Sequence, residues 1–141
     1  MDLASSGYNA SMIKRAVQTV KQAAKRAVIS LARDISYYGL LPATYRKAAS
    51  QPINPRKVVF VVEKGEGVPS AYSVIYPYMR DYYDLDISFV HIGINAGVGR
   101  KERLQRAMQL AREVATAHIV FLDDASREIS SLPIRKGTTV V

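Results

Sequence analysis

"KVVFVV" (Lys57–Val62) is the stretch of sequence that decides the fold. It is a short run of β-branched and aromatic residues without polar alternation, which is typical of a strand buried on both faces, as in a parallel sheet. Two similar runs follow it, "DISFVHIGI" (Asp86–Ile94) and "HIVFLDD" (His118–Asp124). A further run, "GTTVV" (Gly137–Val141), predicts the start of a fourth strand.

Helical patterns separate these runs. Ser70 is a plausible N-cap for a helix over Ala71–Tyr83, in which Pro77 is expected to cause a kink. A second amphipathic helix is predicted over Arg100–Ala117. Its expected inward residues are Leu104, Met108, Ala111 and Val114 or Ala115. The alternation of strands and helices predicts an α/β fold with a Rossmann-like parallel sheet.

Parallel sheets bind ligands at the carboxyl ends of their strands. Here those ends are Glu63–Gly67, Asn95–Gly99 and Asp123–Ser126. The loop "EKGEG" precedes a helix, but its spacing fits neither nucleotide-binding glycine motif, so it is interpreted as a flexible turn or as a polar substrate contact.

Other polar residues near the strands give no catalytic signature. Asp123 and Asp124 are expected at a solvated strand end, and His91 and His118 as packed or hydrogen-bonded histidines. The chain has no cysteine, which excludes disulfides and thiolate metal sites. We therefore expect no catalytic residue, metal site or cofactor within these 141 residues.

The N-terminal segment is strongly basic. Residues 1–56 hold nine of the 20 Lys and Arg residues but only two of the 12 acidic ones. A helix is predicted over Met12–Tyr38, with Gly39 and Pro42 as stop signals. Its apolar residues recur at helical spacing: Ile13, Val17, Val20, Ala24, Val28, Leu31 and Ile35. Its basic residues lie beside this stripe: Lys14, Arg15, Lys21, Lys25, Arg26 and Arg33.

Two roles fit such a helix. It packs on a protein surface, including a second copy of the chain, or it lies on an anionic membrane with Lys and Arg reaching the headgroups. No nucleic-acid partner is expected, because aromatic residues are not interleaved with the charges. No apolar run approaches the roughly 20 residues that span a bilayer. Residues 42–56 contain three prolines and are predicted to form a linker, with a short helix over Ala43–Ser50.

Three stretches from Lys57 onward resemble a known family: "VVFVVEKGEGVPSAYSVIYPYM", "AREVATAHIVFLDD" and "LPIRKGTTVV". They are similar to the N-terminal half of the CDP-glycerol glycerophosphotransferases, the teichoic acid polymerases and primases of Gram-positive bacteria. The matching positions of the first stretch are Glu63, Gly67, Ile75–Tyr76 and Tyr78, whereas Pro77 departs from the family pattern. In that family the third stretch leads into a Trp-His-Gly motif, which is expected shortly after Val141.

The resemblance implies a two-domain, glycosyltransferase-B-like enzyme whose N-terminal domain faces a lipid-linked acceptor. The C-terminal domain, expected beyond these residues, holds CDP-glycerol or CDP-ribitol and the catalytic histidine. The chain then divides into a basic helical segment (1–41), a linker (42–56) and an acceptor-side domain (57–141), inactive by itself, at the cytoplasmic face of the plasma membrane. By analogy the acceptor-binding residues are Glu63, Lys64, Gly65, Gly67 and Ser70.

Two alternatives remain beside this interpretation. One is a stand-alone α/β binding or regulatory domain, whose basic helix engages a protein or nucleic acid. The other is half of a glycosyltransferase that uses a sugar nucleotide.

Overall fold

The computed structural model of the chain describes the backbone of residues 4–65, 67–93 and 98–141, and the side chains of these ranges from residue 10 onward. The chain divides into two compact units, Met1–Ile35 and Ser36–Val141. The first unit is the helix α1 (Ala4–Ile35). The second contains the sheet and the remaining helices.

The second unit is built on a four-stranded, all-parallel sheet with the order β2-β1-β3-β4. Its strands are β1 (Asn54–Val62), β2 (Asp86–His91), β3 (Ala117–Leu122) and β4 (Thr139–Val140). Val62 lies opposite His91 of β2, and Val61 lies opposite Leu122 of β3, so the three carboxyl ends meet at one edge. The predicted Rossmann-like α/β fold is thus confirmed, including the fourth strand.

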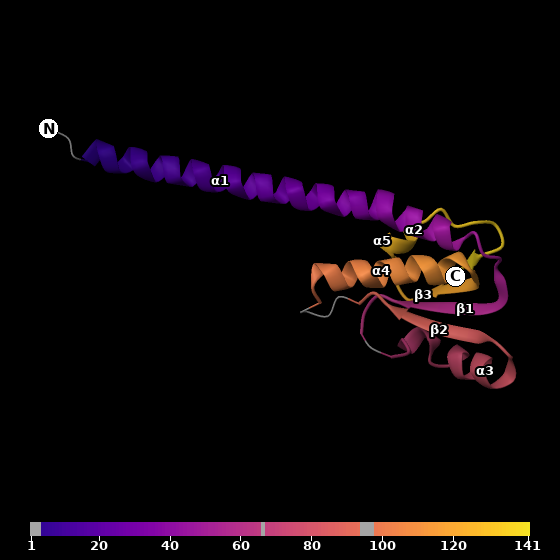
Figure 1. The fold of residues 1–141 in the computed structure, drawn as a ribbon. Coiled ribbons are helices and arrows are strands. Elements are labelled where there is room, and N and C mark those ends of the chain that lie inside the picture. Colours follow the sequence, from indigo (N-terminus) through magenta and orange to yellow (C-terminus); the bar gives the residue numbers. More distant parts are fainter. Residues whose placement is uncertain (1–3, 66, 94–97) are drawn as a thin grey trace. The chain divides into compact units, whose positions relative to one another are not determined.

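β1 is central, and it is covered on both faces. Val59 and Val61 pack into the main core together with α4 (Arg100–Ala115) and α2 (Leu41–Ala48), which lie over one face of the sheet (Figure 1). Phe60 alternates with these residues along the strand and points to the opposite face. Its ring lies 6.1 Å from that of Tyr76 in α3 (Ile75–Tyr82). There it stacks between Phe89 and Phe121 at centroid distances of 5.0 and 4.9 Å. This two-sided burial explains why β1 lacks polar alternation.

The inward face of α4 is shifted from the predicted one. Ala111, Val114 and Ala115 are buried as expected, whereas Leu104 and Met108 are only half-buried. Ala107 and Leu110 are buried in their place. Helical periodicity indicates an apolar face without fixing its centre, and the buried face of α4 is centred nearer to Ala107 and Leu110 than the larger apolar residues alone predict.

The predicted linker over residues 42–56 is wrong for most of its length, although the short helix expected over Ala43–Ser50 is present as α2, shifted by two residues. Leu41 and Tyr45 of α2 are each only 1% exposed in the core, and β1 begins at Asn54. The helix stop at Gly39 is also wrong: a π-helical turn (Ser36–Leu40) leads directly into α2. Gly39 does not take the left-handed conformation of a helix-ending glycine. Pro42 lies in the first turn of α2, where its missing N–H costs little.

The segment after β1 also differs from prediction. A short 3-10 turn (Ser70–Tyr72) precedes α3, and Ser70 opens this turn without capping a helix through its side chain. Pro77 lies in the first turn of α3, where proline is tolerated, so the expected kink within a longer helix does not arise. Ile94 and residues 95–97 of the expected second strand end lie outside the described residues. A four-residue helix, α5 (Arg127–Ser130), follows β3.

Candidate functional site

Glu63 and Asp123 lie side by side where β1 and β3 end. The backbone N–H of Glu63 donates a hydrogen bond of 2.9 Å to Asp123 Oδ1. Asp123 was expected to face solvent at the end of its strand. Instead, its carboxylate accepts a hydrogen bond from the backbone of Glu63. This bond fixes the direction in which the chain leaves β1.

The Glu63 side chain is buried, with 9% of its surface exposed. Its Oε1 atom has no hydrogen-bond partner among the described residues. Burial is the main cause that raises the pKa of Glu63; a hydrogen bond with Ser126 opposes it, and the charges of Glu128 and Asp123 add to it. A carboxyl group in this setting holds its proton to higher pH than an exposed one.

Lys64, the next residue, points to solvent and pairs with Asp124 at 3.0 Å. The hydrogen bond to Asp124 raises the pKa of Lys64, and the same bond lowers the pKa of Asp124. Because both side chains are well exposed, the pair adds little to stability.

Gly65 and Gly67 give the loop after β1 its shape. Both take left-handed backbone angles, φ 82° and 86°, that favour glycine over residues with a side chain. The N–H of Gly67 donates to His91 Nε2 at 3.2 Å, and the same ring nitrogen lies 3.2 Å from the Gly67 carbonyl oxygen. The expected hydrogen-bonded role of His91 is confirmed, and the loop is tied to the end of β2.

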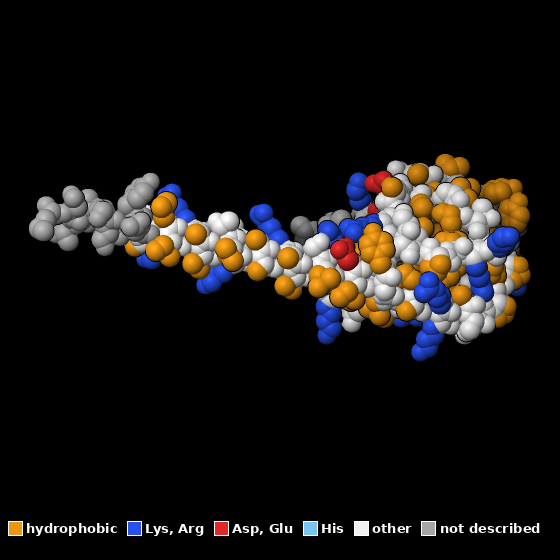
Figure 2. Space-filling view, turned by 90° about the horizontal axis from the view of Figure 1, so that it is seen from above, with side chains coloured by type: hydrophobic (Ala, Val, Ile, Leu, Met, Phe, Trp, Pro, Cys, Tyr) orange, Lys and Arg blue, Asp and Glu red, His pale blue; other side chains and the backbone are white. Residues whose placement is uncertain are grey.

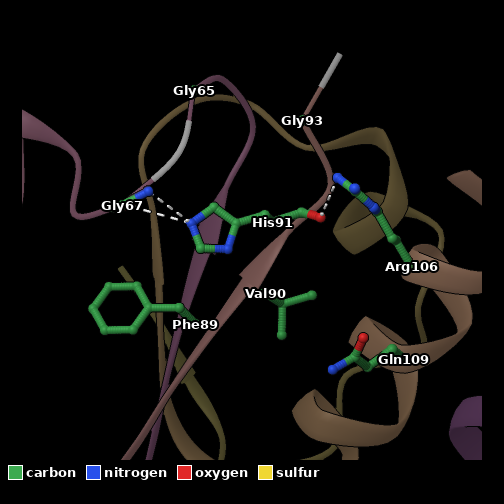
Figure 3. A pocket seen from close by; sticks show the side chains of 8 residues that line it. All are labelled: Gly65, Gly67, Phe89, Val90, His91, Gly93, Arg106 and Gln109. Atoms are coloured by element: carbon green, nitrogen blue, oxygen red, sulfur yellow. Dashed lines mark hydrogen bonds between the residues drawn. The ribbon is translucent and has the colours of Figure 1, made fainter. Parts of the chain in front are cut away.

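A cavity of about 440 Å³ opens at the carboxyl end of β2 (Figure 3). Three elements line it: the loop after β1, the end of β2 and the outer side of α4. Arg106 and Gln109 reach it from α4, and the His91 ring points across it toward Gly67. The lining residues are Gly65, Gly67, Phe89, Val90, His91, Gly93, Arg106 and Gln109.

Arg106 is held at the rim of the cavity by two contacts. Its Nη1 donates to the His91 carbonyl oxygen at 3.4 Å, and its Nη2 pairs with Glu102 one turn earlier at 2.5 Å. A guanidinium has five N–H groups, so these two bonds leave donors for a ligand. Among the described residues that line the cavity, none carries a carboxylate side chain.

Of the five acceptor-binding residues expected by analogy, the structure brings Gly65 and Gly67 to this cavity. Glu63 is buried and Lys64 pairs with Asp124 on the surface, and neither is among the described lining residues. Ser70 is exposed, and its carbonyl oxygen accepts a bond from the Ser73 hydroxyl at 2.8 Å. The cavity residues Arg106 and Gln109 were missed by sequence reasoning, although their spacing of three residues on a helix places them on one face.

Glu128 forms a second buried polar cluster behind the strand ends. It is 1% exposed, and its Oε1 accepts a bond of 2.7 Å from the Tyr37 hydroxyl and pairs with Arg103 at 3.4 Å. Ser126 caps α5 by accepting from the Ile129 N–H at 3.3 Å. These contacts give Glu128 partners from other elements of the fold, which indicates a structural role, although the buried Arg103 Nε has no hydrogen-bond partner among the described residues. Within the described residues, no three His, Asp or Glu side chains gather in a way that could hold a metal ion.

The helix α1 carries the other candidate surface. The apolar residues of its stripe are exposed, for example Val20 at 68% and Val28 at 67%. Figure 2 shows hydrophobic side chains along the helix with Lys and Arg side chains projecting on either side. All six basic residues named above for membrane binding are exposed. In the described part of the chain, no helix is long and apolar enough to cross a membrane.

The fold and site define an α/β domain with a Rossmann-like parallel sheet and a long N-terminal helix. The sequence matches no protein-family model, and it matches no curated protein.

Proposed function

We propose that the chain is the acceptor-side, membrane-proximal domain of a glycerophosphotransferase of teichoic acid synthesis. The enzyme would transfer glycerol phosphate, or ribitol phosphate, from a CDP-polyol to a lipid-linked acceptor. One observation carries the proposal: the stretch that most resembles the family, around Glu63 and Gly67, forms the carboxyl edge of a parallel sheet beside an open cavity. That edge is where sheets of this kind bind their ligands.

The reaction sets the task of this domain. An acceptor hydroxyl attacks the β-phosphorus of the CDP-polyol; the bond from the acceptor oxygen to that phosphorus forms, and the bond to the bridging oxygen breaks as CMP leaves. A general base takes the hydroxyl proton. The resemblance assigns that base and the nucleotide site to the part of the enzyme that follows Val141. The present residues would hold the acceptor in place, which lowers the entropic cost of the reaction.

The local charges are compatible with a phosphate-bearing acceptor. Glu63 is buried and is not among the described residues that line the cavity. Lys64 and Asp124 offset one another. Arg106 remains as a cation at the cavity rim.

The helix α1 supports the membrane-proximal part of the proposal. An exposed apolar stripe flanked by Lys and Arg suits the headgroup region of an anionic bilayer. Each basic side chain near such a surface contributes about 1 kcal/mol, so the six together give reversible attachment. A lipid-linked acceptor at the cytoplasmic face of the plasma membrane would then lie within reach of the domain.

A second candidate rests on the same helix. An exposed stripe with spacings of three and four residues also fits a partner helix, including that of a second copy. In that case the chain would be a stand-alone binding domain rather than part of an enzyme.

The test is a transfer assay on the full-length protein. CMP release from CDP-glycerol is measured with and without a membrane-anchored acceptor that ends in glycerol phosphate, and a UDP-sugar serves as the control donor. Acceptor-dependent CMP release supports the proposal. Transfer from the UDP-sugar alone, or no transfer from either donor, contradicts it.

A further inference from the structure

We propose that the outer edge of β2 pairs with β2 of a second copy of the chain, in the antiparallel direction. The tyrosine cluster at the amino end of each β2 (Tyr78, Tyr82 and Tyr83) would then enter the cavity at the carboxyl end of the other. Three features of the second unit carry this inference: the edge of the sheet, the cavity and the tyrosine cluster. It goes beyond the proposed function and does not depend on it.

The first feature is the edge of the sheet. Among the described residues, β2 pairs with β1 alone and is therefore an outer strand. The N–H of Ile92 donates to the Val62 carbonyl oxygen at 2.9 Å, so the backbone groups of every second residue of β2 face β1. The N–H and C=O groups of Ile87 and Phe89 consequently point away from the sheet.

This edge lacks the usual protection against pairing. Proteins commonly protect an outer strand with lysine, proline or a bulge. β2 contains no lysine or proline, and its register with β1 is regular. Asp86 is its one acidic residue and stands at the amino end, ahead of the uncharged run Ile-Ser-Phe-Val (87–90). A row of unpaired backbone groups on such a strand is a template for another strand.

The second feature is the cavity, which reaches round this edge. Three consecutive residues of β2, Phe89 to His91, line it. Successive side chains of a strand point to opposite faces, and Figure 3 shows Phe89 and Val90 on opposite sides of β2. A cavity that contacts both sides therefore lies along the outer edge and not on one face of the sheet. Gly65, Gly67 and Gly93 leave it open, because they have no side chains.

The third feature is the tyrosine cluster. Tyr78, Tyr82 and Tyr83 are each more than half exposed, and the Tyr78 ring lies 4.8 and 5.9 Å from the other two. Tyr83 directly follows α3 and leads into β2, and the Tyr76 ring of α3 lies 5.0 Å from the Phe89 ring. The cluster is thus next to the amino end of the outer strand. Tyrosine is enriched at protein interfaces.

The positions of the cluster and the cavity favour a second copy as the partner. They lie at opposite ends of the same outer strand. Antiparallel pairing about a two-fold axis brings the amino end of one β2 to the carboxyl end of the other, so each cluster meets a cavity, as a self-complementary interface requires. The cavity volume of about 440 Å³ is within the roughly 300 to 1,000 Å³ of sites for drug-sized molecules, so it can hold a tyrosine ring.

The backbone groups define the register. Ile87 and Phe89 expose theirs, so Ile87 of one copy faces Phe89 of the other, and Ser88 faces Ser88 at the axis. Tyr83 then lies at the level of Gly93 beside the cavity. The buried Ser88 Oγ has no hydrogen-bond partner among the described residues, and facing serine side chains on paired strands can bond to one another.

The charges agree with this register. It places Asp86 of one copy opposite Val90 of the other, at the end of β2 where Arg106 is held. Asp86 is exposed in the single chain. The guanidinium of Arg106 retains donors beyond its bonds to Glu102 and the His91 carbonyl oxygen, so each dimer would gain two ion pairs of opposite charge.

The first experiment measures the oligomeric state of the full chain by sedimentation velocity over a range of concentrations. We expect an equilibrium between monomer and dimer. Tyr82→Ser should weaken dimerisation about tenfold or more, because tyrosines are frequent hot spots of interfaces. Tyr38→Ser makes the same change in the turn before α2, at 71% exposure against 74% for Tyr82, and should have no effect. A chain that is monomeric at every concentration, or equal effects of the two variants, overturns the proposal.

The second experiment tests the register by cross-linking. The chain has no cysteine, so a single introduced cysteine can form a disulfide only with another copy. Facing Cα atoms of a non-hydrogen-bonded antiparallel pair are about 4.5 Å apart, which a disulfide can span. After mild oxidation with copper phenanthroline, Ser88→Cys should form a linked dimer and the exposed control Ser50→Cys much less. Equal cross-linking of both variants overturns the proposal.

A further variant separates this contact from one made through α1. Val20→Lys places a charge in the exposed apolar stripe of α1 and should dimerise like the wild type. Loss of the dimer in Val20→Lys but not in Tyr82→Ser would assign the contact to α1 and overturn the proposal. Transfer from CDP-glycerol by a full-length protein that stays monomeric would contradict this inference and leave the proposed function intact.

Discussion

The hydroxyl of Tyr37 donates a hydrogen bond of 2.7 Å to Glu128 Oε1, although 91 residues separate the two in sequence. Tyr37 lies in the π-helical turn before α2, and Glu128 lies in α5. The Arg127 guanidinium lies over the Tyr37 ring at 4.6 Å. Burial is the largest cause that raises the pKa of Tyr37, and the hydrogen bond to Glu128 is the second. These contacts attach the π-helical turn before α2 to α5, the short helix that follows β3.

The first prediction concerns this bond. Tyr37→Phe removes a donor from a carboxyl group that is 1% exposed, so the free energy of unfolding should fall by about 1 to 3 kcal/mol. Tyr38→Phe makes the same change on a side chain that is 71% exposed and should alter stability by less than about 0.5 kcal/mol. Urea denaturation of both variants checks the difference. Equal effects would show that the Tyr37 hydroxyl contributes nothing specific.

The second prediction is a pH dependence at Glu63. Its folded-state pKa is raised above 4.5, so its proton is held more tightly in the folded chain. The corresponding stability is fully present below about pH 4.5 and is lost as pH rises through the folded pKa. Glu63→Gln cannot ionise, so it should gain stability relative to wild type between pH 4 and pH 7. Denaturation curves of both proteins at these two pH values provide the measurement, and a constant difference would contradict the burial argument.

The third prediction concerns membrane attachment through α1. Replacing Lys14, Lys21 and Lys25 by Gln should reduce co-sedimentation with anionic vesicles by about tenfold or more, because about 1 kcal/mol is lost per charge. Binding of the wild type should weaken at high salt and be absent with neutral lipid.

The control variant carries the same change of charge on the other unit, at the exposed residues Lys101, Arg112 and Lys136. We expect it to sediment like the wild type. If both triple variants lose binding equally, overall charge and not the helix causes attachment.

The fourth prediction follows from the unit boundary at Ile35. A chain of residues 36–141 should fold by itself, whereas a chain of residues 49–141 should not. The longer deletion removes Leu41 and Tyr45, each 1% exposed, together with the Tyr45 hydroxyl that accepts a bond of 3.0 Å from the Arg135 N–H. Loss of each large core side chain costs about 2 to 5 kcal/mol, which matches or exceeds the stability of many small domains. Circular dichroism during thermal unfolding checks both chains; cooperative unfolding of residues 49–141 would restore the linker interpretation.

The fifth prediction follows from the proposed function. The chain of 141 residues alone should neither bind CDP-glycerol nor release CMP from it, since the resemblance assigns the nucleotide site and the base to other residues. Chromatographic analysis of CMP after long incubation is the measurement. Turnover by this chain would place catalytic groups among its own residues.

Local patterns in the sequence predicted the strands and the two long helices. The continuous apolar run at Lys57–Val62 and the two runs after it indicated buried parallel strands, because only such strands need no polar face. The helical spacing of apolar residues predicted the apolar stripe of α1 and most of the length of α4. In the same way, the carboxyl ends of the strands indicated where the candidate site would lie.

Only the tertiary structure decided which side chains meet there. Gly39 and Pro42 are local stop signals, but burial of Leu41 and Tyr45 outweighs them, because packing contributes more free energy than local propensity. The bond from Tyr37 to Glu128 and the meeting of His91 with Arg106 join residues that are remote in sequence. Periodicity records which face of an element is apolar, whereas the partner of each polar group depends on how the elements pack, and this is why the cavity could not be predicted from the sequence.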